Sequence, residues 1–252
     1  MLHVDAHFAR GRTHAVCQDY TAQGPGVAVV CDGCSSAPHS DVGARLLAHA
    51  ALQASPAALA DGTWLTGPDA ARRRLGLPEA SLDATCIVAR GDAHGVTVTM
   101  LGDGVVAARR ARDGALVVIE VSFPKCAPPY PSYGLDPRRR AAYADAGLGA
   151  PTIEASPDAP APTMGPGRLS WTFPRSQWSA VLIGSDGLCA FQREDRTLHP
   201  TADVVDALFR YPSPHGAFVT RRLRRYLAKQ APAAGLSPED DVAVAALCWE
   251  GP

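Results

Sequence analysis

The sequence has almost no net charge and no long apolar run. Its 24 Lys and Arg residues stand against 25 Asp and Glu residues, a formal net charge of -1 at pH 7. A balance of this kind gives no electrostatic footprint for nucleic acid or for an acidic membrane. No apolar run approaches the ~20 residues that a membrane-spanning helix needs. We therefore expect no nucleic-acid partner and no membrane association.

The sequence also lacks the marks of secretion. Residues 1–5 contain no basic region followed by an apolar stretch, so no signal peptide is expected. The seven cysteines are odd in number and have no paired spacing, which argues against a disulfide framework. Cys31 and Cys34 form a single CxxC, but no second thiolate or histidine pair completes a zinc site, and Cys31 fits a small core residue. These features predict a soluble cytoplasmic protein.

What the chain does contain is enough apolar sequence for a large core. With 252 residues and 46% hydrophobic residues, it is long enough for one or two domains, and we expect one over residues 1–252. Apolar runs and alternation predict strands at 2–9, 26–31, 84–90, 95–101, 104–110, 115–122, 168–173, 179–184 and 241–249. Helical spacing predicts helices at 41–53, 68–75, 137–146, 200–210 and 215–229.

The order of these elements predicts an α+β fold. The strands between 84 and 122 are joined by Gly-Asp and Asp-Gly turns, without helices that would make parallel crossovers, so they form an antiparallel meander. Residues 124–167 are dense in proline and interrupt this pattern, which predicts a flap or extended connection. The expected architecture is a pair of packed antiparallel sheets covered by helices.

The candidate site begins with aspartates at strand ends. Asp32, Asp103 and Asp186 each follow an apolar strand beside glycine, Asp240 precedes the last strand, and Asp19 makes a fifth. An Asp-Gly pair alone is an ordinary turn. Several carboxylates at one edge raise one another's pKa, and hard divalent ions with oxygen ligands relieve this repulsion. Two Mg²⁺ or Mn²⁺ ions ~3.5–4 Å apart can hold a hydroxide for in-line attack on phosphorus.

In their order along the chain, these residues resemble the metal-dependent protein phosphatases of type 2C (the PPM family), in particular a bacterial branch. Six segments carry the resemblance: Gly11 to Gln18-Asp19, Asp32-Gly33, Asp83-Ala84-Thr85, Gly102-Asp103-Gly104, Ser185-Asp186-Gly187-Leu188 and Asp240-Asp241-Val242. The segment Gln18-Asp19-Tyr20, together with residues 32–38 and 41–45, also resembles stand-alone phosphatases encoded near kinases in bacterial tellurium-resistance-like clusters.

The resemblance implies a sandwich of two antiparallel sheets with helices on both outer faces (α-β-β-α) and a site for two Mg²⁺ or Mn²⁺ ions. By position, Asp32 would bridge both ions, and the carbonyl of Gly33 would help to hold one. Asp186 and Asp240 would bind the other ion, and Asp19 would orient metal-bound water. The implied reaction is direct hydrolysis of phosphoserine or phosphothreonine by a bridging hydroxide.

Other positions depart from the pattern of the family. His14 stands where the family has its phosphate-binding arginine; a histidinium can hold phosphate but lacks the bidentate fork. Arg12 is the alternative phosphate ligand, and His14 can also be an ordinary hydrogen-bonded residue. Ala190 stands where members with a third metal have aspartate, although Asp103 can still join such a site or serve only its hairpin.

Three further positions complete these expectations. Gln18 replaces a common glutamate, and Cys34 follows Gly33 where some members carry a histidine acid, which leaves protonation of the leaving group to water. The flap at 124–167 is expected to govern substrate access. The predicted function is a serine/threonine phosphatase in bacterial signalling that opposes a cognate kinase. The alternatives are a weakly active regulatory module that binds a phosphorylated partner, or a hydrolase of small phosphorylated molecules.

Overall fold

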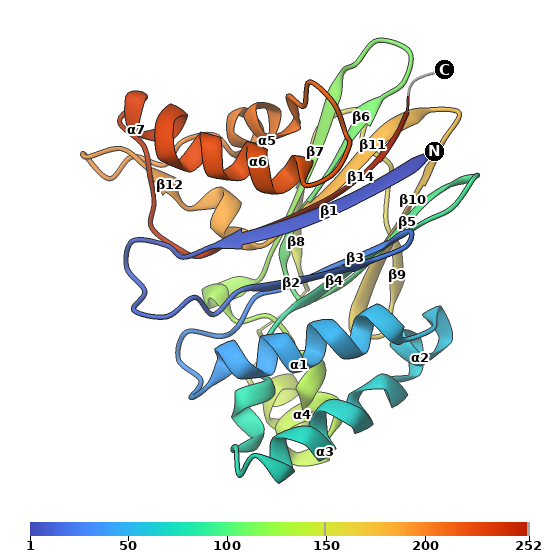
Figure 1. Ribbon diagram of the computed structural model, residues 1–252. Helices are drawn as coiled ribbons and strands as arrows, with labels where there is room; N and C mark the ends of the chain where they lie inside the picture. The colour runs from blue at the N-terminus through green and yellow to red at the C-terminus, as the bar shows by residue number, and fades with distance from the viewer. Residues whose placement is uncertain (149, 251–252) are drawn as a thin grey trace.

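Two six-stranded sheets packed face to face form the centre of the molecule, with helices on both outer faces (Figure 1). The structure, a computed structural model, describes residues 1–148 and 150–250. Gly149, Gly251 and Pro252, which the predicted domain and flap include, lie outside the described residues. The α+β sandwich expected from the sequence is confirmed. That residues 1–252 form a single domain stays a prediction.

The first sheet contains the N-terminal and C-terminal strands side by side. Every neighbouring pair in it is antiparallel. Its order is β1 (Leu2–Ala9), β14 (Val242–Trp249), β11 (Trp178–Gly184), β6 (Gly104–Arg110), β7 (Leu116–Ser122) and β8 (Thr152–Ala155).

The second sheet contains the predicted strands 26–31, 84–90, 95–101 and 168–173. It is also antiparallel throughout, in the order β2 (Tyr20–Gly24), β3 (Val27–Cys31), β4 (Cys86–Gly91), β5 (Gly95–Leu101), β10 (Arg168–Pro174) and β9 (Thr163–Gly165). A short ladder joins β12 (Phe191–Gln192) to β13 (Ser237–Pro238). The turn between β5 and β6 carries the chain from the second sheet to the first.

Helices cover the two outer faces. The outer face of the second sheet carries α1 (Ser40–Gln53), with α2 (Pro56–Asp61), α3 (Thr66–Arg74) and α4 (Pro137–Asp145) beside it, and the first sheet carries α5 (Thr201–Phe209) and α6 (Phe218–Arg225) (Figure 1). α2 starts where Ser55 accepts a hydrogen bond from the Ala58 N–H and Pro56 takes the first turn. Among the described residues, no helix has the length and apolarity needed to cross a membrane.

Alternation along the strands produces three layers of apolar packing. Between the sheets lie fully buried side chains such as Trp171, Phe173 and Met100. Separate clusters fill the space under α1 and under α5 and α6. Burying one such side chain contributes about 1.5–3 kcal/mol, so these layers fix the strand ends that carry the candidate site.

Several elements differ from the sequence-based expectation. β2 was not predicted, because only Ala22 of its five residues is buried and its apolar alternation is weak. The proline-rich stretch 124–167 contributes not only α4 but also β8 and β9, which extend the two sheets. The helix predicted over 215–229 begins at Phe218 and passes at Tyr226 into a π-helical turn that ends at Gln230.

Candidate metal centre

The predicted aspartates lie at one end of the sandwich, and the two sheets share in supplying them. Asp32 follows β3 of the second sheet, Asp103 sits in the turn between β5 and β6, and Asp186 follows β11 of the first sheet. The backbone past β3 stays paired, because the Thr85 N–H donates to the Asp32 carbonyl at 2.8 Å and Gly33 bridges Ala84. Asp32 therefore has a fixed position at the mouth of its strand.

The charges of these carboxylates raise one another's pKa. Burial raises the pKa of Asp32 well above its usual range, and the charges of Asp19 and Asp186 add to the rise. Burial likewise raises the pKa of Asp19, where the charges of Asp186 and Asp241 add to it while the Ser185 hydroxyl opposes it. The pKa of Asp240 is raised by burial and then by the charge of Asp186. The charge of Asp186 thus contributes to the raised pKa of Asp19, Asp32 and Asp240.

Asp19 provides a direct test of whether a cation fits here. Asp19 is only 3% exposed, and within residues 1–148 and 150–250 its Oδ2 atom has no hydrogen-bond partner. An unpaired buried carboxylate oxygen costs several kcal/mol unless something neutralises it. Oxygen-rich clusters of this kind are the donor set that Mg²⁺ and Mn²⁺ prefer. The described residues therefore fit one or more hard divalent ions.

Asp103 belongs to the same group. It is 8% exposed, and burial followed by the charge of Asp186 raises its pKa to about 7. Gly102 and Gly104 on either side have φ of 104° and 130°, a conformation that side chains avoid, and they let the chain cross between sheets within two residues. Asp103 is both part of this hairpin and an available ligand.

The pH dependence of stability follows from this shift. The pKa of Asp103 is about 7 in the folded chain and ~3.9 when unfolded, so its contribution of up to about 4 kcal/mol is complete below pH ~4 and is lost as the pH rises through about 7. We expect Asp103→Asn to raise the melting temperature in EDTA at pH 8.5 more than at pH 5. Thermal unfolding of both proteins at the two pH values measures this, and an equal difference at both would contradict it.

The last strand brings a residue that the sequence analysis did not single out. Asp241 is 1% exposed, and its carboxylate accepts hydrogen bonds from the Gly11 N–H at 2.7 Å and the Gln18 N–H at 2.6 Å. His14 Nδ1 lies 2.9 Å from Asp241 Oδ2 and 3.5 Å from Asp240 Oδ1. Asp241 therefore pins the loop of residues 11–18 and fixes the His14 ring beside Asp240, which remains 44% exposed.

Arg12 is not gathered into the carboxylate group. Its guanidinium pairs with Glu239 at 2.7 Å, and its side chain is 68% exposed. Its backbone N–H donates to the Pro238 carbonyl at 2.9 Å. Of the two cationic candidates from the sequence, the structure places His14 in contact with the predicted ligands and directs Arg12 to Glu239.

Glycine at two positions allows the segments to meet. A Cβ on Gly33 would lie 2.7 Å from the Gln18 carbonyl oxygen and 2.9 Å from that of Ser40. A Cβ on Gly187 would lie only 1.7 Å from the Asp241 carbonyl oxygen. Backbone packing this close, which only glycine permits, holds the aspartates of different strands in one cluster.

The proline-rich segment folds back over this end of the molecule. Burial raises the pKa of Tyr130, with a hydrogen bond to Cys34 as the next cause and the charges of Cys34, Asp32 and Asp103 following, which places the tyrosine beside the centre. Ser132 donates to Asp83 Oδ1 at 2.6 Å, and Arg139 donates to Asp83 Oδ2 at 2.6 Å. No pattern in the sequence predicted these contacts, which tie the predicted flap to Asp83 in the loop before β4.

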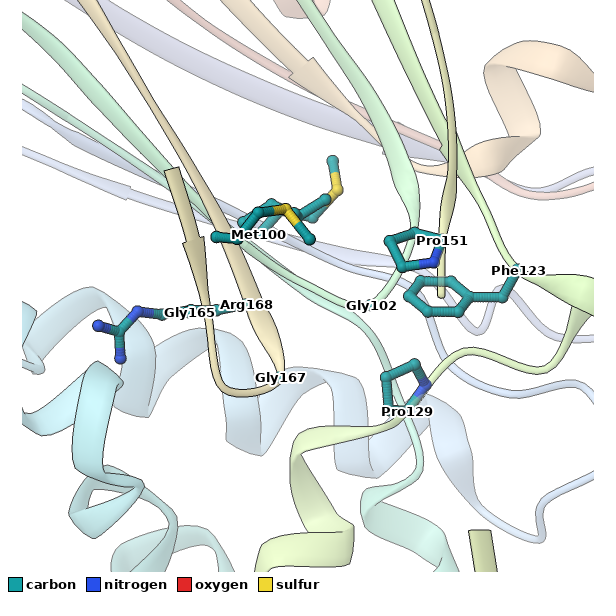
Figure 2. A pocket seen from close by; sticks show the side chains of 10 residues that line it. Met100, Gly102, Phe123, Pro129, Pro151, Gly165, Gly167 and Arg168 are labelled. Atoms are coloured by element: carbon teal, nitrogen blue, oxygen red, sulfur yellow. The ribbon is translucent and has the colours of Figure 1, made fainter. Parts of the chain in front are cut away.

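Two hollows lie under the same segment. Figure 2 shows one of about 220 Å³, with Phe123, Pro129 and Pro151 on one side and Met100 on the other. The second, of about 440 Å³, is lined by apolar and aromatic side chains that include Leu101 and Tyr130. The first contains no carboxylate among its lining residues, so it is not a metal site. Gly102, which precedes Asp103 in the chain, lines the first hollow, and Tyr130 lines the second.

Comparison with known proteins agrees with this geometry. Residues 9–125 match the sequence family described as "Protein phosphatase 2C". No protein of curated function matches the chain significantly. The matched range contains Asp19, Asp32 and Asp103, and it confirms the resemblance to the metal-dependent type 2C phosphatases. The segments around Asp186 and Asp240 lie outside the matched range.

Solved structures show the same fold over almost the whole chain. The serine/threonine phosphatase PstP/Ppp of Mycobacterium tuberculosis has 18% identity and a TM-score of 0.52, covering 99% of each chain. The catalytic domain of PstP in complex with two manganese ions has 19% identity and a TM-score of 0.51, covering 98% of this chain and 97% of that one. Stp1 of Staphylococcus aureus has 10% identity and a TM-score of 0.54, covering 100% and 96%.

Proposed function

Because this chain has the fold of the type 2C phosphatases and matches their family over residues 9–125, we propose that it is a metal-dependent serine/threonine protein phosphatase. The observation that carries the proposal is the cluster of mutually repelling carboxylates around Asp186, in which the buried Oδ2 of Asp19 has no partner. The tellurium-resistance-like relationship and the cognate kinase stay predictions.

The proposed ligands come from the two sheets. Asp32 and the Gly33 carbonyl would hold one ion, and Asp32, Asp186 and Asp240 would hold the other, with Asp103 available to a further ion. When bound, two such ions neutralise charge on a phosphoryl group and lower the pKa of a water nucleophile. The raised pKa values of Asp32 and Asp103 support this role, because they show that the ionised carboxylates repel one another in the absence of a cation. A bound cation would make the ionised forms favourable.

The chain's own groups would orient the reactants. Asp19 Oδ2 is free to accept a hydrogen bond from the attacking water. The Nδ1 atom of His14 faces Asp241 Oδ2 at 2.9 Å, so its Nε2 is the ring atom left to contact a phosphate oxygen. A histidine offers one donor where arginine offers a planar fork, so phosphate binding here relies more on the ions.

The protein part of the substrate would lie along the flap. The hollows lined by Gly102 and by Tyr130 have mainly apolar linings, which suits side chains flanking a phosphorylated serine or threonine. Such residues are absent from a small phosphorylated molecule. All seven cysteines are free, which supports the proposed cytoplasmic location, where a kinase product would be the substrate.

A direct assay tests the proposal. Purified protein treated with EDTA is expected to hydrolyse p-nitrophenyl phosphate and a phosphothreonine peptide only after addition of Mn²⁺ or Mg²⁺, and Asp186→Ala is expected to abolish both activities. Circular dichroism of the variant controls for folding. Metal binding by the wild-type chain without turnover of any phosphopeptide would reject the phosphatase and favour a phosphoprotein-binding module. Turnover of phosphorylated metabolites alone would favour the small-molecule hydrolase.

A further inference from the structure

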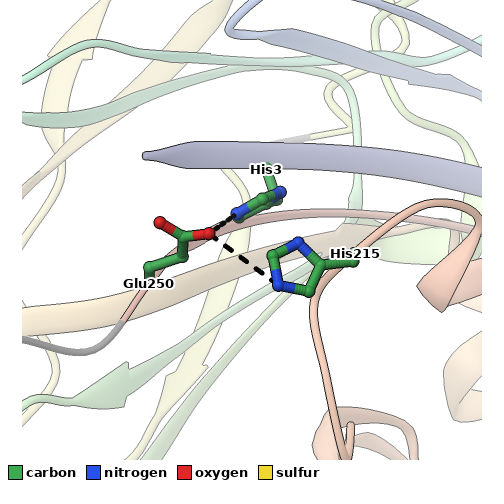
Figure 3. A group of neighbouring side chains, drawn as sticks. All are labelled: His3, His215 and Glu250. Carbon is green, nitrogen blue, oxygen red and sulfur yellow. Dashed lines mark ion pairs between the residues drawn. The ribbon is translucent and has the colours of Figure 1, made fainter.

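A second group of side chains with metal-ligand atoms lies at the opposite end of the first sheet. His3 belongs to β1, Glu250 follows β14, and His215 lies in the loop between α5 and α6 (Figure 3). The carboxylate cluster adjoins the start of β14 at Val242, whereas Glu250 lies beyond its end at Trp249. At ~3.3 Å per residue, about 25 Å of strand separate the two groups.

The strand register brings His3 and Glu250 together. His3 pairs with Cys248 across the ladder, and the Glu250 N–H donates to the Met1 carbonyl at 3.0 Å. Alternate residues of a strand share one face, so Cys248 and Glu250 point to the side on which His3 lies. That side is covered by α6, whose preceding loop supplies His215.

The ligand atoms are spaced as around a single ion. His3 Nε2 lies 3.0 Å from Glu250 Oε1, and His215 Nε2 lies 3.8 Å from the same oxygen. All three ligand atoms fall within 4.8 Å of one another. Tetrahedral zinc with bonds of ~2.0–2.2 Å requires ligand atoms about 3.4 Å apart, a value between the two measured separations.

Glu250 uses its two oxygens differently: Oε2 lies 3.2 Å from the N-terminal amine of Met1, which leaves Oε1 to the two histidines. His3 is 13% exposed, its Nε2 atom is buried, and among the described residues that atom has no hydrogen-bond partner of good geometry. The His215 ring stands edge-on to the His3 ring, with centroids 4.6 Å apart, and turns its Nε2 toward the shared carboxylate oxygen (Figure 3). At 3.8 Å that contact is too long for a hydrogen bond. Both imidazoles therefore direct their Nε2 atoms toward Glu250 Oε1, and His215 makes no hydrogen bond to it.

We infer that His3, His215 and Glu250 form a zinc site separate from the carboxylate centre. Two imidazoles and one carboxylate suit zinc, whereas Mg²⁺ prefers the all-oxygen cluster at the other end. His215 is 64% exposed and Glu250 is 41% exposed, so an ion can enter from solvent. The bound ion ties the edge strand β1, the last strand β14 and the α5–α6 loop together.

Zinc binding should be measured in the full chain with the carboxylate centre disabled. In the double variant Asp32→Asn with Asp186→Asn, titration calorimetry is expected to show one tight equivalent of Zn²⁺, which millimolar Mg²⁺ does not displace. Adding His215→Gln is expected to weaken zinc binding at least ~100-fold. The matched control is His94→Gln, an exposed histidine of the β4–β5 turn, which should leave it unchanged.

A stability measurement provides a second readout. Zinc at 100 times its dissociation constant should raise the melting temperature by ~5 °C or more in the His94→Gln protein and not in the His215→Gln protein. Because His215 is exposed, its replacement should leave the fold intact. Absence of a bound equivalent, or equal zinc affinity in the two histidine variants, would overturn the inference. Neither readout depends on phosphatase activity.

Discussion

Asp32→Asn is expected to reduce Mn²⁺-dependent kcat/KM by at least ~10³-fold while raising the melting temperature of the metal-free protein. Loss of a shared ligand removes the charge neutralisation that metal ions supply in the transition state, and ~4 kcal/mol of barrier corresponds to that factor. Since the amide is nearly the same size as the carboxylate, the change is one of charge alone. Activity and stability should therefore move in opposite directions.

The gain in stability has a separate physical origin. The pKa of Asp32 is raised by burial and by the charges of Asp19 and Asp186, which means that its ionised form is unfavourable in the folded chain without cations. The neutral amide removes that cost. A variant that lost both activity and metal-free stability would instead identify Asp32 as a structural turn residue.

The measurements need an aspartate that lies away from the cluster as control. Asp203 on α5 is 64% exposed and contacts His199 only at 3.9 Å, so Asp203→Asn should change neither kcat/KM nor melting temperature. Steady-state kinetics with a phosphopeptide and thermal unfolding in EDTA cover both quantities. Adding Mn²⁺ should raise the melting temperature of the wild type and of the control more than that of Asp32→Asn.

Gly187→Ala is expected to destabilise the protein by about 3 kcal/mol or more, equivalent to ~10 °C in melting temperature. The added Cβ would stand 1.7 Å from the Asp241 carbonyl oxygen, a backbone atom with little freedom to move. Either the turn that carries Asp186 or the start of β14 must shift. Metal binding should weaken along with stability, because these two segments supply Asp186 and Asp240.

Gly24→Ala is the comparison for this substitution. Its Cβ would meet the Leu52 side chain at 3.6 Å, an ordinary contact, and its stability should change by only about 0.5 kcal/mol. Denaturant unfolding of both variants gives the two free energies. Equal losses of unfolding free energy in Gly187→Ala and Gly24→Ala would show that the close approach of residue 187 to the Asp241 carbonyl does not limit the side chain at this position.

The strand-end aspartates were predictable because their signal is local. A buried apolar run that ends in Asp beside Gly fixes both the strand and the edge at which its carboxylate lies, as Asp32 and Asp103 show. The acidic run Glu239-Asp240-Asp241 is different. The sequence cannot show which of three adjacent acids turns inward. Asp241 is buried because it accepts hydrogen bonds from Gly11 and Gln18, which the fold brings from the other end of the chain.

The remaining contacts depend on tertiary structure in the same way. His14 was identified by its position in the family pattern, but its partner Asp241 was not. Tyr130 lies in a proline-rich stretch whose path over the centre has no periodic signal. His3, His215 and Glu250 have no ligand spacing in the sequence to connect them. The register of β1 with β14 brings His3 to Glu250, and the loop before α6 adds His215.

The crossing of the chain from one sheet to the other at Gly102-Asp103 has a mechanical consequence. Asp32 belongs to one sheet and Asp186 to the other, so the separation of these carboxylates depends on how the sheets are seated on each other. The interdigitated layer that contains Met100 and Trp171 sets that seating. If the sheets slid past each other by a fraction of an ångström, the spacing between Asp32 and Asp186 would change. The apolar interior would therefore set the spacing of the two proposed ions.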